Sequence, residues 1–275
     1  MRRIRFVSER GAIRTGVLCE DDPSRAQVLS GPFPGNPARA KTFRRIRRLL
    51  APVSPPNILA LGLNYRQHAA ETRMDLPKIP VVFMKATSSL VGPGDPILLP
   101  GAGPDHVDYE GELAVVIGRE VRNASPDDAR AAVLGYTCAN DVSARDWQFL
   151  EQNGQWIRGK SFDTFCPLGP WIVTPEALPD PQRLRLRTLL NGTVVQEAST
   201  ADMIFSIPQI ISDLSRTMTL LPGTVILTGT PQGVGFSRTP PLFLRDGDTV
   251  TVEIEGIGAL TNPVRTERDP ARPGS

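Results

Sequence analysis

Residues 105–118 read DHVDYEGELAVVIG, and in this stretch two carboxylates, Glu110 and Glu112, precede a run of apolar residues. Side chains alternate between the two faces of a strand, so both carboxylates point to the same face as Ala114 and Val116. The opposite face is apolar too. Because a strand that is apolar on both faces is normally covered on both, the stretch predicts a buried strand at the centre of a sheet.

The two carboxylates at the start of this strand predict a metal site. Unpaired carboxylates in a buried place cost free energy or take up protons unless a cation neutralises them. A third acid, Asp141, closes the apolar run 136–140, which suits the end of a neighbouring strand. Three carboxylates fit Mg²⁺ or Mn²⁺, with Ca²⁺ also compatible, and no Cys or His lies at zinc spacing. The alternative is that Glu110 and Glu112 form a solvated strand end.

Composition narrows the class of protein. The chain has 275 residues, 40% hydrophobic and 22% charged, which suits a large globular domain with a small appendage. Its 31 basic residues against 29 acids give a net charge of +2, too balanced to predict nucleic-acid binding. Three scattered cysteines imply no disulfide framework, and no apolar run is long enough to span a bilayer. We therefore expect a cytoplasmic protein with no membrane partner.

Turn residues and strand patterns divide the chain. Its 27 prolines and 24 glycines predict many turns and a sheet-rich α+β fold. Residues 1–53 form a predicted small N-terminal domain, which the proline-rich segment 52–56 separates from a larger domain over 54–275. The arginines of Arg44–Arg48 could form a phosphate-binding patch, but the solvated face of a short connecting helix is the preferred interpretation. Ser125 and Pro126 predict the start of another helix.

Four motifs carry a resemblance to a known family. They are Tyr109-Glu110-Gly111-Glu112-Leu113, Asn140-Asp141-Val142-Ser143-Ala144-Arg145-Asp146, Arg158-Gly159-Lys160-Ser161-Phe162-Asp163-Thr164-Phe165 and Leu227-Thr228-Gly229-Thr230-Pro231. In this order the sequence, from about Pro56 to Asn262, resembles the fumarylacetoacetate hydrolase family, including its acylpyruvate hydrolase and 2-hydroxyhepta-2,4-diene-1,7-dioate isomerase-like members. The resemblance implies a mixed β-sandwich roll with peripheral helices after a small N-terminal domain, and a homodimer. One departure is Lys85-Ala86-Thr87-Ser88, where the family often has Lys-Pro-Pro-Ser. This segment is expected in the pocket wall, so the departure concerns the identity of the substrate more than the chemistry.

The resemblance also implies roles for residues outside the acid cluster. His68 and Glu71 are three apart and would share a helix face; by themselves they suggest a surface pair, but the resemblance implies a lid that activates water. Lys160 would balance the charge of three carboxylates, and the family places a lysine there. Four further residues resemble the family's substrate contacts: Arg145, Gln148, Gly229 and Thr230.

The function that follows is a divalent-metal-dependent hydrolase of carbon–carbon bonds. Its substrate would be a small 2-keto or β-diketo acid of the acylpyruvate type, and the charge of the resulting enolate would be stabilised by the metal and Lys160. The same enolate arises in decarboxylation of oxaloacetate and in isomerisation or hydration of an unsaturated 2-keto acid, so these remain alternatives. A non-catalytic binding protein that retains the metal site is a further alternative.

Overall fold

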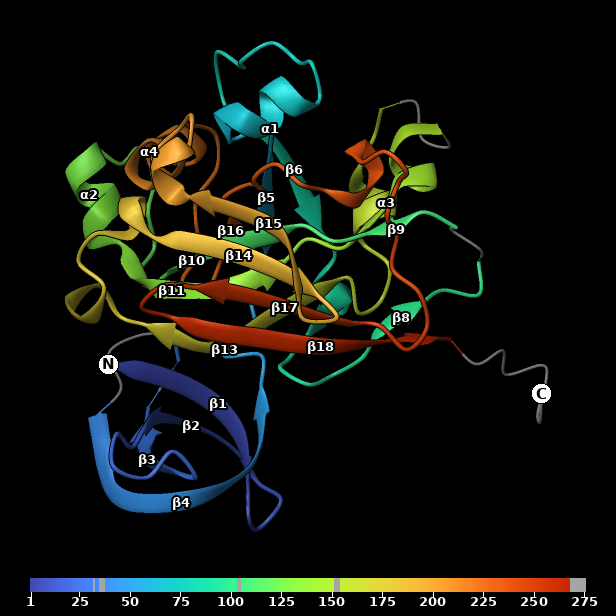
Figure 1. Cartoon of the computed structure of the whole chain (residues 1–275). Helices are drawn as coiled ribbons and strands as arrows, with labels where there is room; N and C mark the ends of the chain where they lie inside the picture. The colour runs from blue at the N-terminus through green and yellow to red at the C-terminus, as the bar shows by residue number, and fades with distance from the viewer. Residues whose placement is uncertain (32, 35–37, 103–104, 151–153, 268–275) are drawn as a thin grey trace.

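The computed structural model describes residues 1–31, 33–34, 38–102, 105–150 and 154–267 (Figure 1). The largest sheet among them has eleven strands. Along its main path the order is β2 (Ile13–Leu18), β3 (Arg25–Ser30), β4 (Ala38–Leu50), β1 (Arg2–Ser8), β13 (Cys166–Val173), β11 (Val133–Asn140), β10 (Gly111–Ile117), β16 (Val225–Leu227), β5 (Ile58–Gly62) and β6 (Val81–Lys85). The short strand β7 (Leu90–Val91) lies beside β13.

A second sheet of five strands packs against β10, β11 and β13 of the first sheet (Figure 1). Its order is β15 (Thr193–Ser199), β14 (Arg185–Leu190), β17 (Thr249–Ile254), β18 (Gly258–Thr266) and β8 (Ile97–Leu99). A separate pair joins β9 (Val107–Asp108) to β12 (Ser143–Ala144). The α+β, sheet-rich class predicted from the sequence is confirmed.

The helices are short and lie at the periphery. They are α1 (Arg66–Glu71), α2 (Pro126–Ala131), α3 (Ile157–Lys160) and α4 (Ile207–Thr217). Ser125 caps α2 as predicted, since its hydroxyl accepts a hydrogen bond from the Asp128 amide at 3.2 Å. Across the described part of the chain, every helix is too short or too polar to cross a bilayer.

The central strand β10 is buried on both faces, as its sequence predicts. Leu113, Val115 and Ile117 pack into a core with residues of the five-stranded sheet and α4. Ala114 and Val116 face a second core on the other side. All seven residues of β10 are buried. This strand is therefore held in place from both sides, and the carboxylates at its start are held with it.

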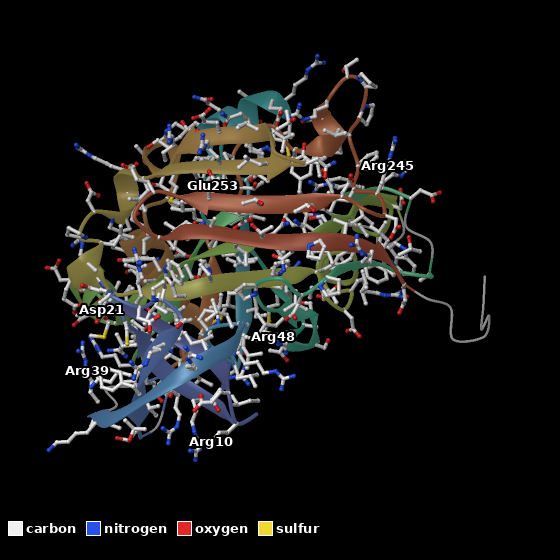
Figure 2. All side chains as sticks on the ribbon, turned by 60° about the horizontal axis from the view of Figure 1, so that its bottom comes forward. Arg10, Asp21, Arg39, Arg48, Arg245 and Glu253 are labelled. Carbon is white, nitrogen blue, oxygen red and sulfur yellow. The ribbon has the colours of Figure 1, made fainter. Side chains whose placement is uncertain are left out.

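The N-terminal strands β1–β4 pair with one another around a small core of their own. Figure 2 shows Arg10, Arg39 and Arg48 on this part of the surface. The helix predicted for Arg44–Arg48 is wrong, because these residues lie in β4. Ile46 and Leu49 are three apart, a helical spacing, but a bulge in the pairing with β1 turns both toward the core.

Candidate active site

Three buried carboxylates meet where two neighbouring strands end. Glu110 directly precedes β10 and Glu112 is its second residue, and Asp141 directly follows β11, which runs antiparallel beside β10. The Asp141 amide donates a hydrogen bond to the Glu110 carbonyl at 2.8 Å. One carboxylate oxygen from each of the three residues lies within 4.8 Å of the others. The structure therefore brings together the three acids that the sequence predicts as metal ligands.

Two buried lysines reach this acid cluster. The Lys160 ammonium, on α3, donates to Glu110 Oε2 at 2.8 Å and to Asp141 Oδ2 at 2.9 Å. The Lys85 ammonium, at the end of β6, donates to Asp141 Oδ1 and to the Val142 carbonyl. Burial works to lower the pKa of Lys160, but Asp141 and Glu110 raise it overall, so Lys160 is a cation at neutral pH.

The three carboxylates differ in their electrostatics. Burial works to raise the pKa of Glu110, but the Lys160 ammonium and then the Arg145 guanidinium lower it to about 2. Burial, reinforced by Asp141 and Glu110, raises the pKa of Glu112 well above its usual range. Glu112 Oε1 has no hydrogen-bond partner among the described residues. A buried oxygen without a partner, in a set of three carboxylates, fits a divalent cation, which would remove the cost of burying this charge.

Arg145 and Gln148 lie against the same cluster. Arg145 Nη1 is 2.6 Å from Glu110 Oε1 and donates to Gln148 Oε1 at 2.8 Å. Both side chains are buried, at 5% and 4% exposure. The chain here forms β12 and then a π-helical turn, Asp146–Leu150. The structure therefore brings Arg145 and Gln148 together at the end of this short strand.

His68 and Glu71 form a hydrogen-bonded pair on α1. His68 Nδ1 lies 3.1 Å from Glu71 Oε2, and Glu71 Oε1 accepts from the Gly233 amide at 2.9 Å. Burial works to raise the pKa of Glu71, but the hydrogen bonds from His68 and Gly233 lower it overall, so Glu71 is a carboxylate. Asn64 fixes the start of this segment by donating to the Phe205 and Thr228 carbonyls at 3.2 and 2.8 Å.

Gly229 and Thr230 follow β16 and close the cluster from the other side. The Gly229 amide donates to Glu112 Oε2 at 2.6 Å. Gly229 has a φ of +96°, and a Cβ there would lie 2.8 Å from the Asn64 Cβ, so this position requires glycine. The Thr230 hydroxyl donates to the Gly111 carbonyl at 3.1 Å and accepts from Gln196 Nε2 at 2.9 Å.

A pocket of about 70 Å³ opens onto these groups. Its polar lining comes from His68, Glu110, Arg145, Gln148, Lys160 and Thr230. Its apolar wall is formed by Leu61, Leu63, Met74, Phe83, Phe149, Trp156 and Phe236. Residues with shifted pKa values thus share one pocket with an apolar wall, which is typical of an active site that takes a small polar substrate.

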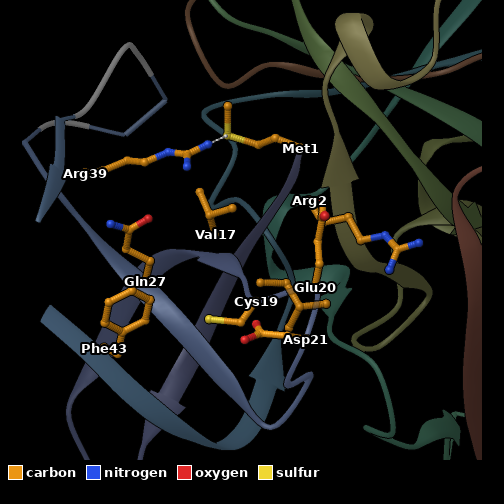
Figure 3. A pocket seen from close by; sticks show the side chains of 10 residues that line it. Met1, Arg2, Val17, Cys19, Glu20, Asp21, Gln27, Arg39 and Phe43 are labelled. Carbon is orange, nitrogen blue, oxygen red and sulfur yellow. Dashed lines mark hydrogen bonds between the residues drawn. The ribbon is translucent and has the colours of Figure 1, made fainter. Parts of the chain in front are cut away.

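A larger pocket of about 360 Å³ lies among the N-terminal strands (Figure 3). Its charged side chains are of both signs, including Arg39, Glu20 and Asp21. Figure 3 shows Arg39 near Met1, and its Nη2 lies 3.6 Å from the Met1 sulfur. This pocket lacks the acid cluster and its lysines. We therefore place the candidate active site at the smaller pocket.

Two functional candidates were missed in the sequence. Lys85 ends the apolar run that begins at residue 80, as Asp141 ends the run 136–140, and this polar end of an apolar run was the available signal. Asp108 is fully buried in β9 and pairs with Arg145. The alternation that singled out Glu110 and Glu112 also puts Asp108 on their face.

Comparisons with known proteins identify the family to which the chain belongs. Residues 57–265 match the family model described as fumarylacetoacetate (FAA) hydrolase C-terminal. The chain is 48% identical over 227 residues to the fumarylacetoacetate hydrolase domain-containing protein 2 homolog of Dictyostelium discoideum, which covers 79% of this chain and 74% of that protein. It is 45% identical over 239 residues to the mitochondrial oxaloacetate tautomerase FAHD2A of Homo sapiens, which covers 86% and 74%.

A solved structure shows the same fold. The 5-carboxymethyl-2-hydroxymuconate delta-isomerase of Mycobacterium smegmatis superimposes with a TM-score of 0.85 at 43% identity, over 97% of this chain and 100% of that one. The match to the family model covers well over half of the 275 residues. The chain belongs to the fumarylacetoacetate hydrolase family, as its motifs predict, and is an enzyme of that family.

Proposed function

We propose that this family member interconverts the keto and enol forms of a small 2-keto diacid of the oxaloacetate type. One observation carries the proposal: the cationic Lys160, Arg145 and His68, which is hydrogen-bonded to Glu71, line one small pocket beside a buried acid cluster. Enolisation needs a base at the substrate carbon and positive charge at its keto oxygen. The name of the human relative, oxaloacetate tautomerase, supports the same reaction.

The proposed cofactor is Mg²⁺ or Mn²⁺, with Ca²⁺ as a non-native substitute, and the proposed ligands are Glu110, Glu112 and Asp141. The unpartnered Glu112 Oε1 and the close approach of the three carboxylates support this assignment. When bound, the ion would act as a Lewis acid toward the substrate's keto and carboxylate oxygens.

The protein's own groups supply binding and proton transfer. Arg145, Gln148 and Thr230 bind and orient the substrate carboxylate, and the Gly229 amide holds Glu112 in place. His68, oriented by Glu71, takes a proton from the carbon beside the keto group.

The electron pair of that C–H bond then moves onto the keto oxygen. Lys160 stabilises the charge there, because two of its three N–H donors are used within the described residues, by Glu110 and Asp141, and the third is left for substrate. Return of the proton to that oxygen gives the enol, and the sequence run backward gives the ketone. Atoms and charge balance without a co-reactant.

Hydrolysis of an acylpyruvate is the second candidate function. Glu71 is ionised and its two oxygens are held by His68 and the Gly233 amide, an arrangement that suits removal of a proton from water. Attack of that water on the distal carbonyl would break a carbon–carbon bond and leave the same enolate beside Lys160. Decarboxylation of oxaloacetate would pass through this enolate too.

We further propose a homodimer with the family's mixed β-sandwich roll, divided into a small N-terminal domain over 1–53 and a catalytic domain over 54–275. The separate core around Ile4 and Phe6 supports this division. Nucleic acid and membrane are not proposed as partners. A cytoplasmic location stays a prediction, since the human relative is named as mitochondrial.

The test follows three readouts after chelation and after restoring Mg²⁺ or Mn²⁺: the enol absorbance of oxaloacetate, release of carbon dioxide from oxaloacetate, and release of pyruvate from a panel of acylpyruvates. Metal-dependent acceleration of enol–keto exchange without carbon dioxide supports the tautomerase. Pyruvate released from acylpyruvates favours the hydrolase, and carbon dioxide favours the decarboxylase. Metal binding without turnover of these substrates would favour the isomerisation or hydration of an unsaturated 2-keto acid.

A further inference from the structure

Asp108 is a fully buried carboxylate with an unusually large set of donors. It lies at the end of β9, two residues before Glu110. Asp108 Oδ2 accepts from Arg145 Nε at 3.0 Å and from Arg145 Nη2 at 2.8 Å. Two donors of one guanidinium thus converge on a single carboxylate oxygen, which restrains the orientation of the guanidinium as well as its position. Asp108 therefore holds Arg145 from the side opposite Glu110.

The same carboxylate also holds a glycine-rich segment that is distant in sequence. Asp108 Oδ1 accepts from the Gly235 amide at 2.8 Å, and Oδ2 accepts from the Phe236 amide at 3.0 Å. A Cβ on Gly235 would lie 1.9 Å from the Leu242 carbonyl oxygen and 2.5 Å from Asp108 Oδ1, so only glycine allows this approach. The Phe236 ring lies under the Arg145 guanidinium, whose carbon is 4.4 Å from the ring centroid. The segment is thus tied to Arg145 through Asp108 and through its own aromatic ring.

The glycine-rich segment leads to the proton-transfer pair. The Gly233 amide, two residues before Gly235, donates to Glu71 Oε1 at 2.9 Å. A continuous series of contacts therefore runs from Arg145 through Asp108 and residues 233–236 to Glu71 and His68. In this series Asp108 supplies the hydrogen bonds that join the substrate-binding arginine to the segment, in addition to the contact between Arg145 and the Phe236 ring.

We propose that Asp108 is a positioning residue that couples the substrate-binding Arg145 to the placement of Glu71. A shift of Arg145 on substrate binding moves Asp108, and the Gly235 and Phe236 amides move with it. The segment then carries the Gly233 amide, and so the Glu71 carboxylate, to the position that proton transfer requires. Asp108 touches no reacting atom in this account. The inference rests on the proposed function of Arg145 and Glu71 as substrate-binding and proton-transferring groups.

The first test is hydrogen–deuterium exchange of the full chain in Asp108→Asn. An asparagine keeps the shape but loses the charge and the second acceptor oxygen, so amides 233–236 should exchange about tenfold faster or more. Arg145→Lys serves as a second variant should Asp108→Asn not fold. It removes the two-bond contact from the other side, and the same amides should again exchange faster, although no amide among them bonds to Arg145.

A matched control is Asp248→Asn. Asp248 also accepts a backbone amide, that of Arg245 at 2.8 Å, and lies in a turn away from the pocket. Its substitution should change exchange near residues 245–248 and leave residues 233–236 as in the wild type. If Asp108→Asn and Arg145→Lys both leave the exchange of 233–236 unchanged, the coupling is refuted, whatever the enzyme's activity.

The second test separates positioning from general damage. Asp108→Asn should lower kcat/KM about 100-fold, the usual effect of misplaced catalytic groups. The double variant Asp108→Asn, Glu71→Gln should lose little more kcat/KM than the more damaging of the two single variants. Effects that multiply fully in the double variant would overturn the proposal. Hydrogen–deuterium exchange is measured without turnover. Inactivity on keto acids would therefore refute the proposed function, while the exchange data would still test the coupling through Asp108.

Discussion

Replacement of Lys160 by methionine tests the electrostatic account of the site most directly. The Lys160 ammonium is buried and lies 2.8 and 2.9 Å from oxygens of Glu110 and Asp141. Removal of one partner from a buried ion pair typically costs about 3–5 kcal/mol, because the remaining charge is uncompensated. Arg145 and Lys85 still contact the two carboxylates, so we expect the lower end, about 3 kcal/mol. At about 2–4 °C per kcal/mol, the metal-free protein should melt about 6–12 °C lower.

The same substitution should strengthen metal binding while it lowers activity. Two unit charges about 4 Å apart interact by about 4 kcal/mol at an effective dielectric constant of 20, so loss of a cation from the cluster favours another cation there. We expect Mn²⁺ to bind Lys160→Met at least about tenfold more tightly, equivalent to about 1.4 kcal/mol. Turnover should fall by about 10²- to 10³-fold, since the charge that stabilises the enolate oxygen is gone.

Calorimetric titration with Mn²⁺ and thermal unfolding with and without the ion measure both effects. Lys41→Met is the matched control, because Lys41 is an exposed lysine in β4; its melting temperature, metal affinity and turnover should match the wild type. Weaker Mn²⁺ binding in Lys160→Met would refute the argument, since it would mean that Lys160 assembles the carboxylates rather than competing with the ion. An unchanged melting temperature would refute the buried ion pair.

Three further predictions concern the carboxylates. Glu112→Gln should melt at a higher temperature than the wild type at neutral pH without metal, because burial raises the pKa of Glu112 and makes its ionised form costly. Mn²⁺ should no longer stabilise this variant. A melting temperature below that of the metal-free wild type would contradict the prediction. Glu110, with its pKa lowered to about 2, stabilises the metal-free fold above its usual pKa of 4.5, and this contribution disappears as the pH falls from about 4.5 toward about 2; denaturant unfolding of Glu110→Gln should show a shallower acid dependence. Glu71→Gln should lose about 10²- to 10⁴-fold in turnover while Mn²⁺ still raises its melting temperature, and full activity would remove its proton-transfer role.

Local pattern was enough for much of the fold. Residues 113–117 are apolar at every position, and such a strand must be covered on both sides, as β10 is. Ser125 before Pro126 set the start of α2, because a cap depends only on neighbouring residues. The local pattern wrongly predicted a helix at Arg44–Arg48. The apolar residues there are three apart, as on a helix, because a bulge interrupts the pairing with β1, a partner strand some forty residues away in sequence.

By itself the sequence determined the buried strand, its two carboxylates and the motifs that identify the family, because each depends on residue type and on alternation along a few neighbouring positions. The tertiary structure alone decided what surrounds them. Lys85 reaches Asp141 from β6 and Lys160 reaches it from α3, and Asp108 joins Arg145 to the amides of residues 235 and 236. Charges on distant segments shift pKa values only when folding brings them within a few ångströms in a dry interior, and no local pattern encodes that distance.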